Sequence, residues 1–349
     1  IPGATVTCNA AGTMGMAFQP LTTVRSGDDG RFELTADDSP RIQLRVEADG
    51  FVRKLVLVES MRQQIQVVLE RGNQVAGTVS DSSGSPVPSF HVAVFTLQSA
   101  MQRTMVAHTA VISAEGKFAV GDLPPGDYQV QALAHGMARS RPVAARSGDT
   151  GLRITLDSGA TLSGQVVDAA SKQGLASAKV SVESSLGSGA AALPLTATAI
   201  TDDDGRFRLS GLGPGPSSVV VAAYRHHGKI VSGLEANPGA QLGPVTIELV
   251  PLEEGESPEV EFAGIGAAIG GHQRGIAVQK VFPGGGAADA ELATGDIITR
   301  VDGASVLDLG FEGSLQRIRG PVGTVVVLTI DRAGDELRQV SVRRKKLRF

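Results

Sequence analysis

The sequence predicts a mainly β protein, with three tandem β-sandwich units followed by a fourth unit of a different kind. Three observations support this prediction. A turn motif that ends in phenylalanine occurs three times at nearly constant spacing. Short runs of alternating apolar and polar residues lie between turns that contain Gly or Pro, with hardly any helical periodicity before residue 252. A glycine-rich loop at 264–266 then runs directly into an apolar strand, and an amphipathic stretch follows at 309–318.

The repeated motif is an Asp-Gly or Glu-Gly turn followed by an alternating strand. Its phenylalanines, Phe32, Phe118 and Phe207, lie 86 and 89 residues apart. Glycine supplies the positive φ that a tight reversal requires, and the residues after it alternate with the period of a strand. A Gly-x-Val strand at Gly77 and Gly164 shares the period, and so does a Pro-Gly turn. About seven strands per repeat are therefore expected. The first repeat lacks the Gly-x-Val strand, so we expect it to be truncated.

These motifs resemble those of the carboxypeptidase regulatory-like family, a transthyretin-like (Cna-B-type) β-sandwich found in strings on bacterial envelope and secreted proteins. The resemblance covers residues 1–251 and is best in the second and third repeats. It implies domains at 1–71 (truncated), 72–157 and 158–251. Residues 252–261 hold five Glu with Gly, Ser and Pro, so an acidic, solvated linker is expected there.

Composition limits the classes of function. A chain of 349 residues predicts about two to three domains, and a formal net charge of −4 argues against a general nucleic-acid-binding surface. Cys8 is the only cysteine, which excludes an intrachain disulfide and a Cys-based metal or redox site. No apolar run approaches the roughly 20 residues of a membrane span. The chain opens on Ile1 in the middle of a repeat, so we expect this sequence to be a fragment, and the lack of a recognisable signal peptide then gives no information on location.

The fourth unit, 262–349, carries the pattern that indicates a function. The small residues Gly264, Gly266 and Ala267 let successive backbone N–H groups approach an anionic chain end, which a larger side chain would obstruct. The strand at 267–269 can then take up an extended ligand as an additional antiparallel strand. With the Leu-x-x-Gly-Asp-x-Ile motif at 292–298 and the Arg-Gly-Pro-x-Gly-Thr motif at 319–324, this pattern resembles a PDZ domain, most closely that of bacterial carboxyl-terminal processing peptidases.

This resemblance implies a small β-barrel with one or two helices and a groove for a peptide carboxyl end. Many PDZ domains have Phe at the fourth loop position; Ala267 stands there, so a roomier pocket for Leu, Val or Phe is expected. The stretch at 309–318, with Phe311 among its apolar residues, is expected to form the opposite wall. Which of these residues face the groove and which face the core stays open. Glu259 and Glu261 are a departure, because many PDZ domains carry a basic residue near the carboxylate. The predicted peptide-binding residues are Gly264, Ile265, Gly266, Ala267, Ala268, Ile269, Leu315 and Ile318.

Other local patterns predict structure rather than chemistry. Residues 284–286 are expected to be a flexible glycine loop, because no Gly-Lys-Ser/Thr follows them. Residues 202–204 offer too few oxygens for calcium and are expected to form a hairpin turn. The pair at 226–227 is the only pair of adjacent histidines, and its side chains should point to opposite faces of a strand, which disfavours a shared metal. No cofactor and no metal site is predicted.

The two tyrosines and the basic end of the chain are also expected to have structural roles. Tyr128 and Tyr224 are expected to pack in sandwich cores rather than bind sugars. Residues 343–348 are expected to be a solvated last strand and tail. No Gly-x-Ser-x-Gly elbow or zinc pattern is present, so no catalytic residue is predicted.

We therefore expect a non-enzymatic, modular envelope, periplasmic or secreted bacterial protein. Its sandwich repeats would present a PDZ domain that binds the apolar C-terminal peptide segments of other proteins, without nucleic acid. One alternative is the substrate-recognition portion of a longer processing protease whose catalytic domain lies outside this sequence. Another is a carbohydrate-binding string of β-sandwiches. The oligomeric state stays open.

Overall fold

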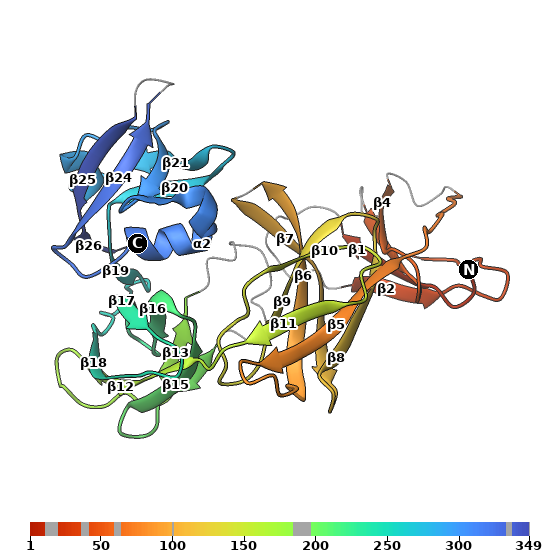
Figure 1. Cartoon of the computed structure of the whole chain (residues 1–349), viewed down its shortest axis with the longest axis horizontal. Coiled ribbons are helices and arrows are strands. Elements are labelled where there is room, and N and C mark those ends of the chain that lie inside the picture. Colours follow the sequence, from red (N-terminus) through yellow and green to blue (C-terminus); the bar gives the residue numbers. More distant parts are fainter. Residues whose placement is uncertain are drawn as a thin grey trace.

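The computed structural model describes residues 1–10, 20–35, 42–58, 64–99, 101–183, 197–332 and 337–348. The chain is mainly β, and β-sheets form each of its four units, as predicted. Figure 1 shows the first unit at one end of the molecule, the second beside it, and the third and fourth together at the opposite end. None of the helices within these ranges is long and apolar enough to cross a membrane.

The first unit is one antiparallel sheet in the order β2-β1-β3-β4. Its strands are β1 (Thr5–Ala10), β2 (Pro20–Arg25), β3 (Ile42–Glu47) and β4 (Lys54–Val58). Apolar side chains from 32–34 and 65–69 pack against the buried face of this sheet, although these segments are not strands. In the second unit the equivalent segments flank a central strand. The sequence holds no counterpart of that central strand in the first unit, so the second layer lacks its ladder.

The second and third units are two-layer sandwiches, each with seven strands among the residues that the structure describes. The second has sheets β10-β9-β6-β7 and β11-β5-β8, and the third has β15-β12-β18 and β14-β13-β16-β17. The second comprises β5 (Asn73–Asp81), β6 (Ser89–Ser99), β7 (Gln102–Ile112), β8 (Lys117–Leu123), β9 (Asp127–Leu133), β10 (Val143–Arg146) and β11 (Leu152–Leu156). The third comprises β12 (Ala160–Asp168), β13 (Lys179–Val182), β14 (Thr198–Ile200), β15 (Arg206–Leu212), β16 (Gly215–Ala222), β17 (Gly228–Ala236) and β18 (Gln241–Leu249).

The glycine of the Gly-x-Val motif has a specific role in each sandwich. Gly77 on β5 faces Leu152 on the parallel strand β11, and a Cβ on Gly77 would lie 2.1 Å from the Leu152 carbonyl oxygen. Gly164 on β12 has the same relation to Val245 on β18, where the corresponding distance is 2.2 Å. The motif glycine is therefore required because the neighbouring backbone leaves no room for a side chain.

Replacing Gly77 with alanine is expected to destabilise the second sandwich by about 3 kcal/mol, because the central strand and β11 must separate. The matched control is Gly121→Ala on β8, where a Cβ would meet nothing within 4 Å. Urea denaturation followed by hydrogen exchange of the second sandwich measures both variants. Equal stability of the two variants would contradict this account of the motif.

The two tyrosines have different environments. Tyr128 is buried, and its hydroxyl donates a hydrogen bond to the Pro124 carbonyl at 2.6 Å, as expected for a core residue. Tyr224 is 91% exposed, so its predicted core position is wrong. The residue that matches Tyr128 in the third sandwich is Ser217, two positions after the glycine of the Pro-Gly turn, and its hydroxyl lies 3.5 Å from the Gly213 carbonyl. Tyr224 lies in the turn that follows β16.

The fourth unit is a sheet in the order β20-β21-β22-β24-β25, with one longer helix packed on it. Its elements are β19 (Val260–Gly264), β20 (Ala267–His272), β21 (Gly275–Val281), α1 (Gly286–Asp289), β22 (Ile297–Val301), β23 (Ala304–Ser305), α2 (Val306–Ile318), β24 (Val325–Asp331), β25 (Arg338–Arg343) and β26 (Lys345–Arg348). The short strand β23 pairs with β22.

A single sheet joins the third and fourth units. Strand β19 pairs in parallel with β17 and antiparallel with β26, which gives the order β14-β13-β16-β17-β19-β26. Residues 253–259 of the acidic segment are exposed, whereas Val260 and Glu261 already belong to β19. His227 holds the segment in place, since its Nε2 lies 3.1 Å from Glu256 and its Nδ1 accepts a hydrogen bond from the Glu259 N–H.

The basic end of the chain forms a last strand, as expected, but the expectation that it is solvated is wrong for Arg344. Residues 345–348 form β26, which pairs with β19. Arg344 is buried, and its guanidinium donates hydrogen bonds to the carbonyl oxygens of Arg317 and Ile318 at the end of α2. The run of basic residues at 343–348 does not show whether this strand is exposed to water or paired with a strand distant in the sequence.

Candidate peptide-binding site

Strand β20 lies at the edge of its sheet. Its pairing partner is β21, and the opposite edge of β20 carries no other strand among the residues that the structure describes. The register places Ala267 opposite Val281 and His272 opposite Gly275, with an irregularity between Ala268 and Ile269. An unpaired strand edge presents N–H and C=O groups that an extended chain can match.

The loop before β20 is fixed by hydrogen bonds to its carbonyl groups. Ile265 O accepts from the Ala287 N–H at 2.6 Å, and Gly266 O accepts from the Phe282 N–H at 2.9 Å. In a trans peptide unit the C=O and the following N–H point in opposite directions. The N–H groups of Gly266 and Ala267 are therefore directed away from Ala287 and Phe282, and that of Ala267 faces the open edge of β20.

Two glycine backbones make this loop possible. Gly266 has a φ of 77°, and a Cβ there would lie 2.6 Å from the Cα of Gly285. Gly286 is equally confined, since a Cβ on it would collide with the Arg343 carbonyl oxygen. The expectation of a flexible loop at 284–286 is wrong for Gly285 and Gly286, which are buried at the start of α1.

Helix α2 starts earlier than predicted and is interrupted. Gly310, with a φ of 68°, separates the first turn from the segment 311–318. Phe311 and Leu315 are half-buried and four residues apart, so they share one face of this segment. Ser314, one residue before Leu315, is fully buried and donates a hydrogen bond to the Gly310 carbonyl at 2.7 Å.

The structure separates the predicted site residues into two groups. Ile265 and Ile318 are buried in the core of the unit, and the backbone of Gly264 is also buried. Phe311, Ala267 and Ile269 pack against that core while remaining half-buried. The remaining predicted site residues are the buried Gly266 and the half-buried Ala268 and Leu315. We define the candidate ligand surface as the backbone of residues 264–269 at the open edge of β20 and the half-buried side chains of Ile269, Phe311 and Leu315.

Comparison with protein families assigns the second, third and fourth units of the chain. The profile of the carboxypeptidase regulatory-like domain matches residues 74–157 and 161–250, and the profile of the PDZ domain matches 254–331. The chain carries two carboxypeptidase regulatory-like domains followed by a PDZ domain. The family resemblance inferred from the motifs is therefore confirmed for these ranges, and neither profile match includes the first unit.

A curated relative resembles a short part of the chain. A probable CtpA-like serine protease of Staphylococcus haemolyticus is 31% identical over 87 residues, which is 25% of this chain and 17% of that protein. The match thus spans less than a fifth of the protease.

The solved structures that match the chain include two pilins, both with low TM-scores. A streptococcal ancillary pilin matches with a TM-score of 0.27 and 14% identity, over 67% of this chain and 82% of the pilin. GBS52, the minor pilin of Streptococcus agalactiae, matches with a TM-score of 0.28 and 15% identity, over 53% of this chain and 99% of the pilin.

Glu261, one of the two acidic residues that depart from the usual PDZ pattern, is surrounded by cations. Glu261 lies 2.7 Å from Lys346, 3.3 Å from Arg348 and 3.5 Å from Lys229. Burial alone would raise the pKa of Glu261, but the hydrogen bond from Lys346 and the charges of Lys229 and Lys346 outweigh it, so the pKa is lowered. Glu261 therefore remains ionised within a cationic cluster and does not present a free negative charge to a ligand.

Sequence reasoning missed the face of α2 that packs on the sandwiches. Gln316 is buried and accepts a hydrogen bond from Ser218 at 2.6 Å. Arg319, just after α2, forms an ion pair with Glu183 and lies 5.3 Å from the Phe262 ring centroid. Burial lowers the pKa of Arg319 to about 10. Polar residues on an otherwise amphipathic helix were the available signal, although they are also typical of a solvated face.

Proposed function

We propose that this chain is a non-catalytic binding protein whose PDZ domain captures apolar carboxyl ends of other proteins. The observation that carries the proposal is that the carbonyl groups of Ile265 and Gly266 are held by hydrogen bonds, which directs the N–H groups of Gly266 and Ala267 away from Ala287 and Phe282 at the start of an open strand edge. Such groups match a carboxylate, and the edge matches the extended chain that leads to it. The half-buried Ile269, Phe311 and Leu315 supply apolar contacts for the last side chains.

The sandwich domains would then serve as the support that presents this site. Their family occurs in strings on bacterial envelope and secreted proteins, which is the basis for proposing an envelope, periplasmic or secreted location. The affinity should be of micromolar order, because a few ligand residues bury little area and must be ordered on binding.

The decisive experiment compares carboxyl ends on the full chain. A fluorescent ten-residue peptide ending in Ala-Leu-Val with a free carboxylate is expected to bind at least tenfold more tightly than the same peptide with an amidated end. The carboxylate accepts charge-assisted hydrogen bonds from the two N–H groups, whereas the amide is neutral and accepts only weaker ones. Fluorescence anisotropy measures both. Equal affinities would falsify the assignment of the carboxylate loop.

A matched pair of variants on α2 tests the proposed wall. Leu315→Glu is expected to weaken binding of the free-acid peptide at least tenfold, because it puts a negative charge on the apolar surface beside the ligand. Leu307→Glu makes the same change on the first turn of α2, where the side chain is exposed, and should leave the affinity within twofold. Similar losses in both variants would place the ligand elsewhere.

The protease relative favours a second candidate. Because the 31% identical match lies in a probable serine protease, this PDZ domain could serve the substrate recognition of a longer processing enzyme. Reading the coding sequence beyond Phe349 tests this directly, and a Ser–Lys catalytic domain there would replace the non-catalytic proposal.

A further inference from the structure

One hairpin of the second sandwich extends beyond its own sheet. Strand β6 pairs with β9 only over His91–Phe95, whereas its pairing with β7 continues to Ser99 opposite Gln102. The ribbon beyond residue 95 is therefore two-stranded and projects from the domain. We call residues 96–99 and 101–105 the finger. Figure 1 shows β6 and β7 reaching toward the PDZ domain, where α2 and β20 lie.

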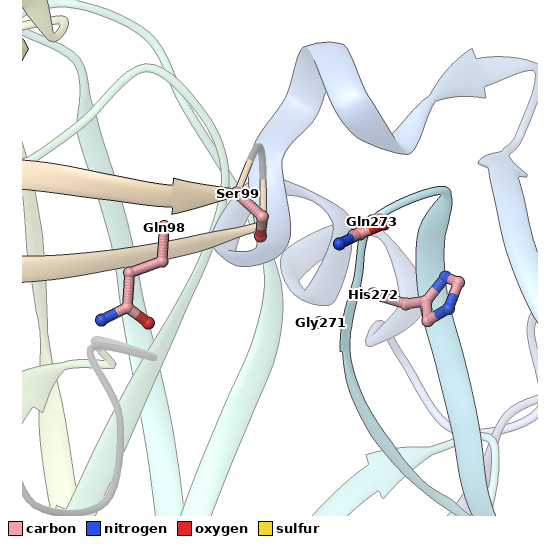
Figure 2. A pocket seen from close by; sticks show the side chains of 5 residues that line it. All are labelled: Gln98, Ser99, Gly271, His272 and Gln273. Carbon is pink, nitrogen blue, oxygen red and sulfur yellow. The ribbon is translucent and has the colours of Figure 1, made fainter.

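The finger meets both walls of the candidate ligand surface. On one side, Gln98 and Ser99 line a hollow together with residues 271–273, the end of β20 and its turn (Figure 2). On the other side, Arg103 lies 3.4 Å from Glu312 on α2, and Arg139 of the second sandwich lies 3.3 Å from the same carboxylate. The finger thus bridges β20 and α2 at the end of the surface remote from Gly266.

The base of the finger is held in position. Arg103 donates a hydrogen bond to Gln131 at 2.7 Å, and its guanidinium lies 4.7 Å from the centroid of the Phe95 ring. These contacts lie within the second sandwich, so they orient the Arg103 guanidinium toward Glu312 independently of the PDZ domain. An arginine fixed in this way loses little further side-chain freedom when the ion pair forms.

The tip of the finger is buried by the PDZ domain. Met101 is only 6% exposed although it occupies the turn of a projecting hairpin, and it belongs to the same apolar cluster as Ile276, Val278 and Val306. Ile269 and Phe311, both on the candidate ligand surface, pack against that cluster. By contrast, Leu97 on the same finger is 52% exposed. An unbranched methionine fills an irregular apolar space readily.

We propose that the finger is an intramolecular competitor of the peptide ligand, with Met101 as the side chain that occupies the site. This inference rests on the proposed function. A ligand whose carboxylate lies at Gly266 runs antiparallel to β20, and this strand of six residues is about 20 Å long. Its fifth or sixth residue from the end would reach the position of Ser99 and Met101. A longer chain therefore has to displace the finger.

The contact is built to be reversible. The ion pairs that Arg103 of the finger and the neighbouring Arg139 form with Glu312 are partly exposed and therefore weak. Within the described part of the finger, Met101 is the apolar side chain that joins the PDZ cluster. If the finger is docked most of the time, the apparent dissociation constant for a ligand rises by the inverse of the fraction that is open.

The test uses the full chain and the free-acid ten-residue peptide described above. Met101→Asp is expected to undock the finger, because it would bury an unpaired charge, and to tighten peptide binding about tenfold relative to the unmodified chain. Leu97→Asp places the same charge on the same finger at an exposed position and should bind like the unmodified chain. Equal affinity in all three proteins, with free acid still preferred over amide, would overturn the finger's role and leave the proposed function intact.

A second readout does not need a ligand. Hydrogen exchange at residues 267–272 is expected to become severalfold faster in Met101→Asp and to stay unchanged in Leu97→Asp, because the finger covers the end of β20. Unchanged exchange in both variants would overturn the inference, whatever the peptides do. If exchange accelerates as expected while free-acid and amidated peptides bind alike, the docked finger stands and the carboxylate-binding function fails.

Discussion

Replacing Asp296 with alanine is expected to lower the free energy of unfolding of the PDZ domain by about 3 kcal/mol. The Asp296 carboxylate is 1% exposed and accepts hydrogen bonds from Arg332 Nε at 2.7 Å, from Arg332 Nη2 at 2.8 Å and from the Ala293 N–H at 2.8 Å. Alanine leaves the Ala293 donor without this acceptor. The cost stays near the lower end for a broken buried ion pair because the Arg332 side chain, 41% exposed, can be hydrated.

The same pair predicts a pH dependence. The hydrogen bond from Arg332 is the main reason that the pKa of Asp296 is lowered, ahead of the opposing effect of burial. Because the folded-state pKa lies below that of the unfolded chain, the stabilisation is complete above about pH 4 and is lost as the pH falls through the folded pKa. In Asp296→Ala this part of the acid sensitivity should disappear.

Hydrogen exchange of β22 and β24 as a function of urea measures the stability of this domain separately from the sandwiches, since a chain of several domains need not unfold in one step. Asp289→Ala is the control. Its carboxylate pairs with Lys345 at 2.7 Å but is 58% exposed, so a loss below 1 kcal/mol is expected. Comparable losses in the two variants would show that the buried Asp296–Arg332 pair contributes no more to the free energy of unfolding than an exposed pair does.

Arg344→Met is expected to destabilise the same domain by about 3 kcal/mol and to loosen α2. The Arg344 guanidinium donates to Ile318 O at 2.9 Å and to Arg317 O at 2.7 Å, which are carbonyl groups that the end of the helix leaves without helical partners. It also donates to Thr324 Oγ1 at 2.9 Å and to Val325 O at 3.0 Å. Methionine fills a similar volume and satisfies none of these acceptors.

Arg343→Met provides the control one residue earlier, because that side chain is exposed and donates to a single carbonyl, that of Gly323 at 2.9 Å. It should cost less than 1 kcal/mol. Circular dichroism during urea denaturation and exchange of the α2 amides measure both changes. If Arg344→Met unfolds at the same urea concentration as Arg343→Met, the capping role assigned to Arg344 is wrong.

Features encoded by neighbouring residues were predictable. The turn glycines Gly30, Gly116 and Gly205 have φ values of 80°, 67° and 78°, as the Asp-Gly and Glu-Gly pattern requires. Gly264–Ile269 was located as a loop followed by an edge strand because small residues and apolar alternation lie side by side in the sequence. In such cases the residue type responds to its own backbone, so a single sequence is sufficient.

Features that depend on distant segments were not predictable in this way. In the sequence, Arg344 is one of several basic residues near the end of the chain. It becomes a core residue only because β26 pairs with β19 and lies beside the end of α2. Tyr224 was assigned to a core by an inexact alignment of the repeats. Met101 gave no signal at all, because an isolated methionine in a hairpin is common and its burial comes from a domain more than 150 residues later in the chain.

The strand ladder shared by β17 and β19 sets how the chain can present a bound partner. A PDZ domain on a flexible linker samples all orientations and can meet targets in every direction. A PDZ domain that is hydrogen-bonded to its neighbour through a common sheet keeps one orientation relative to that neighbour. Cargo held at Gly266 would therefore be offered along one axis relative to the third sandwich. Targets on that axis would encounter it at high local concentration, and targets elsewhere would not encounter it.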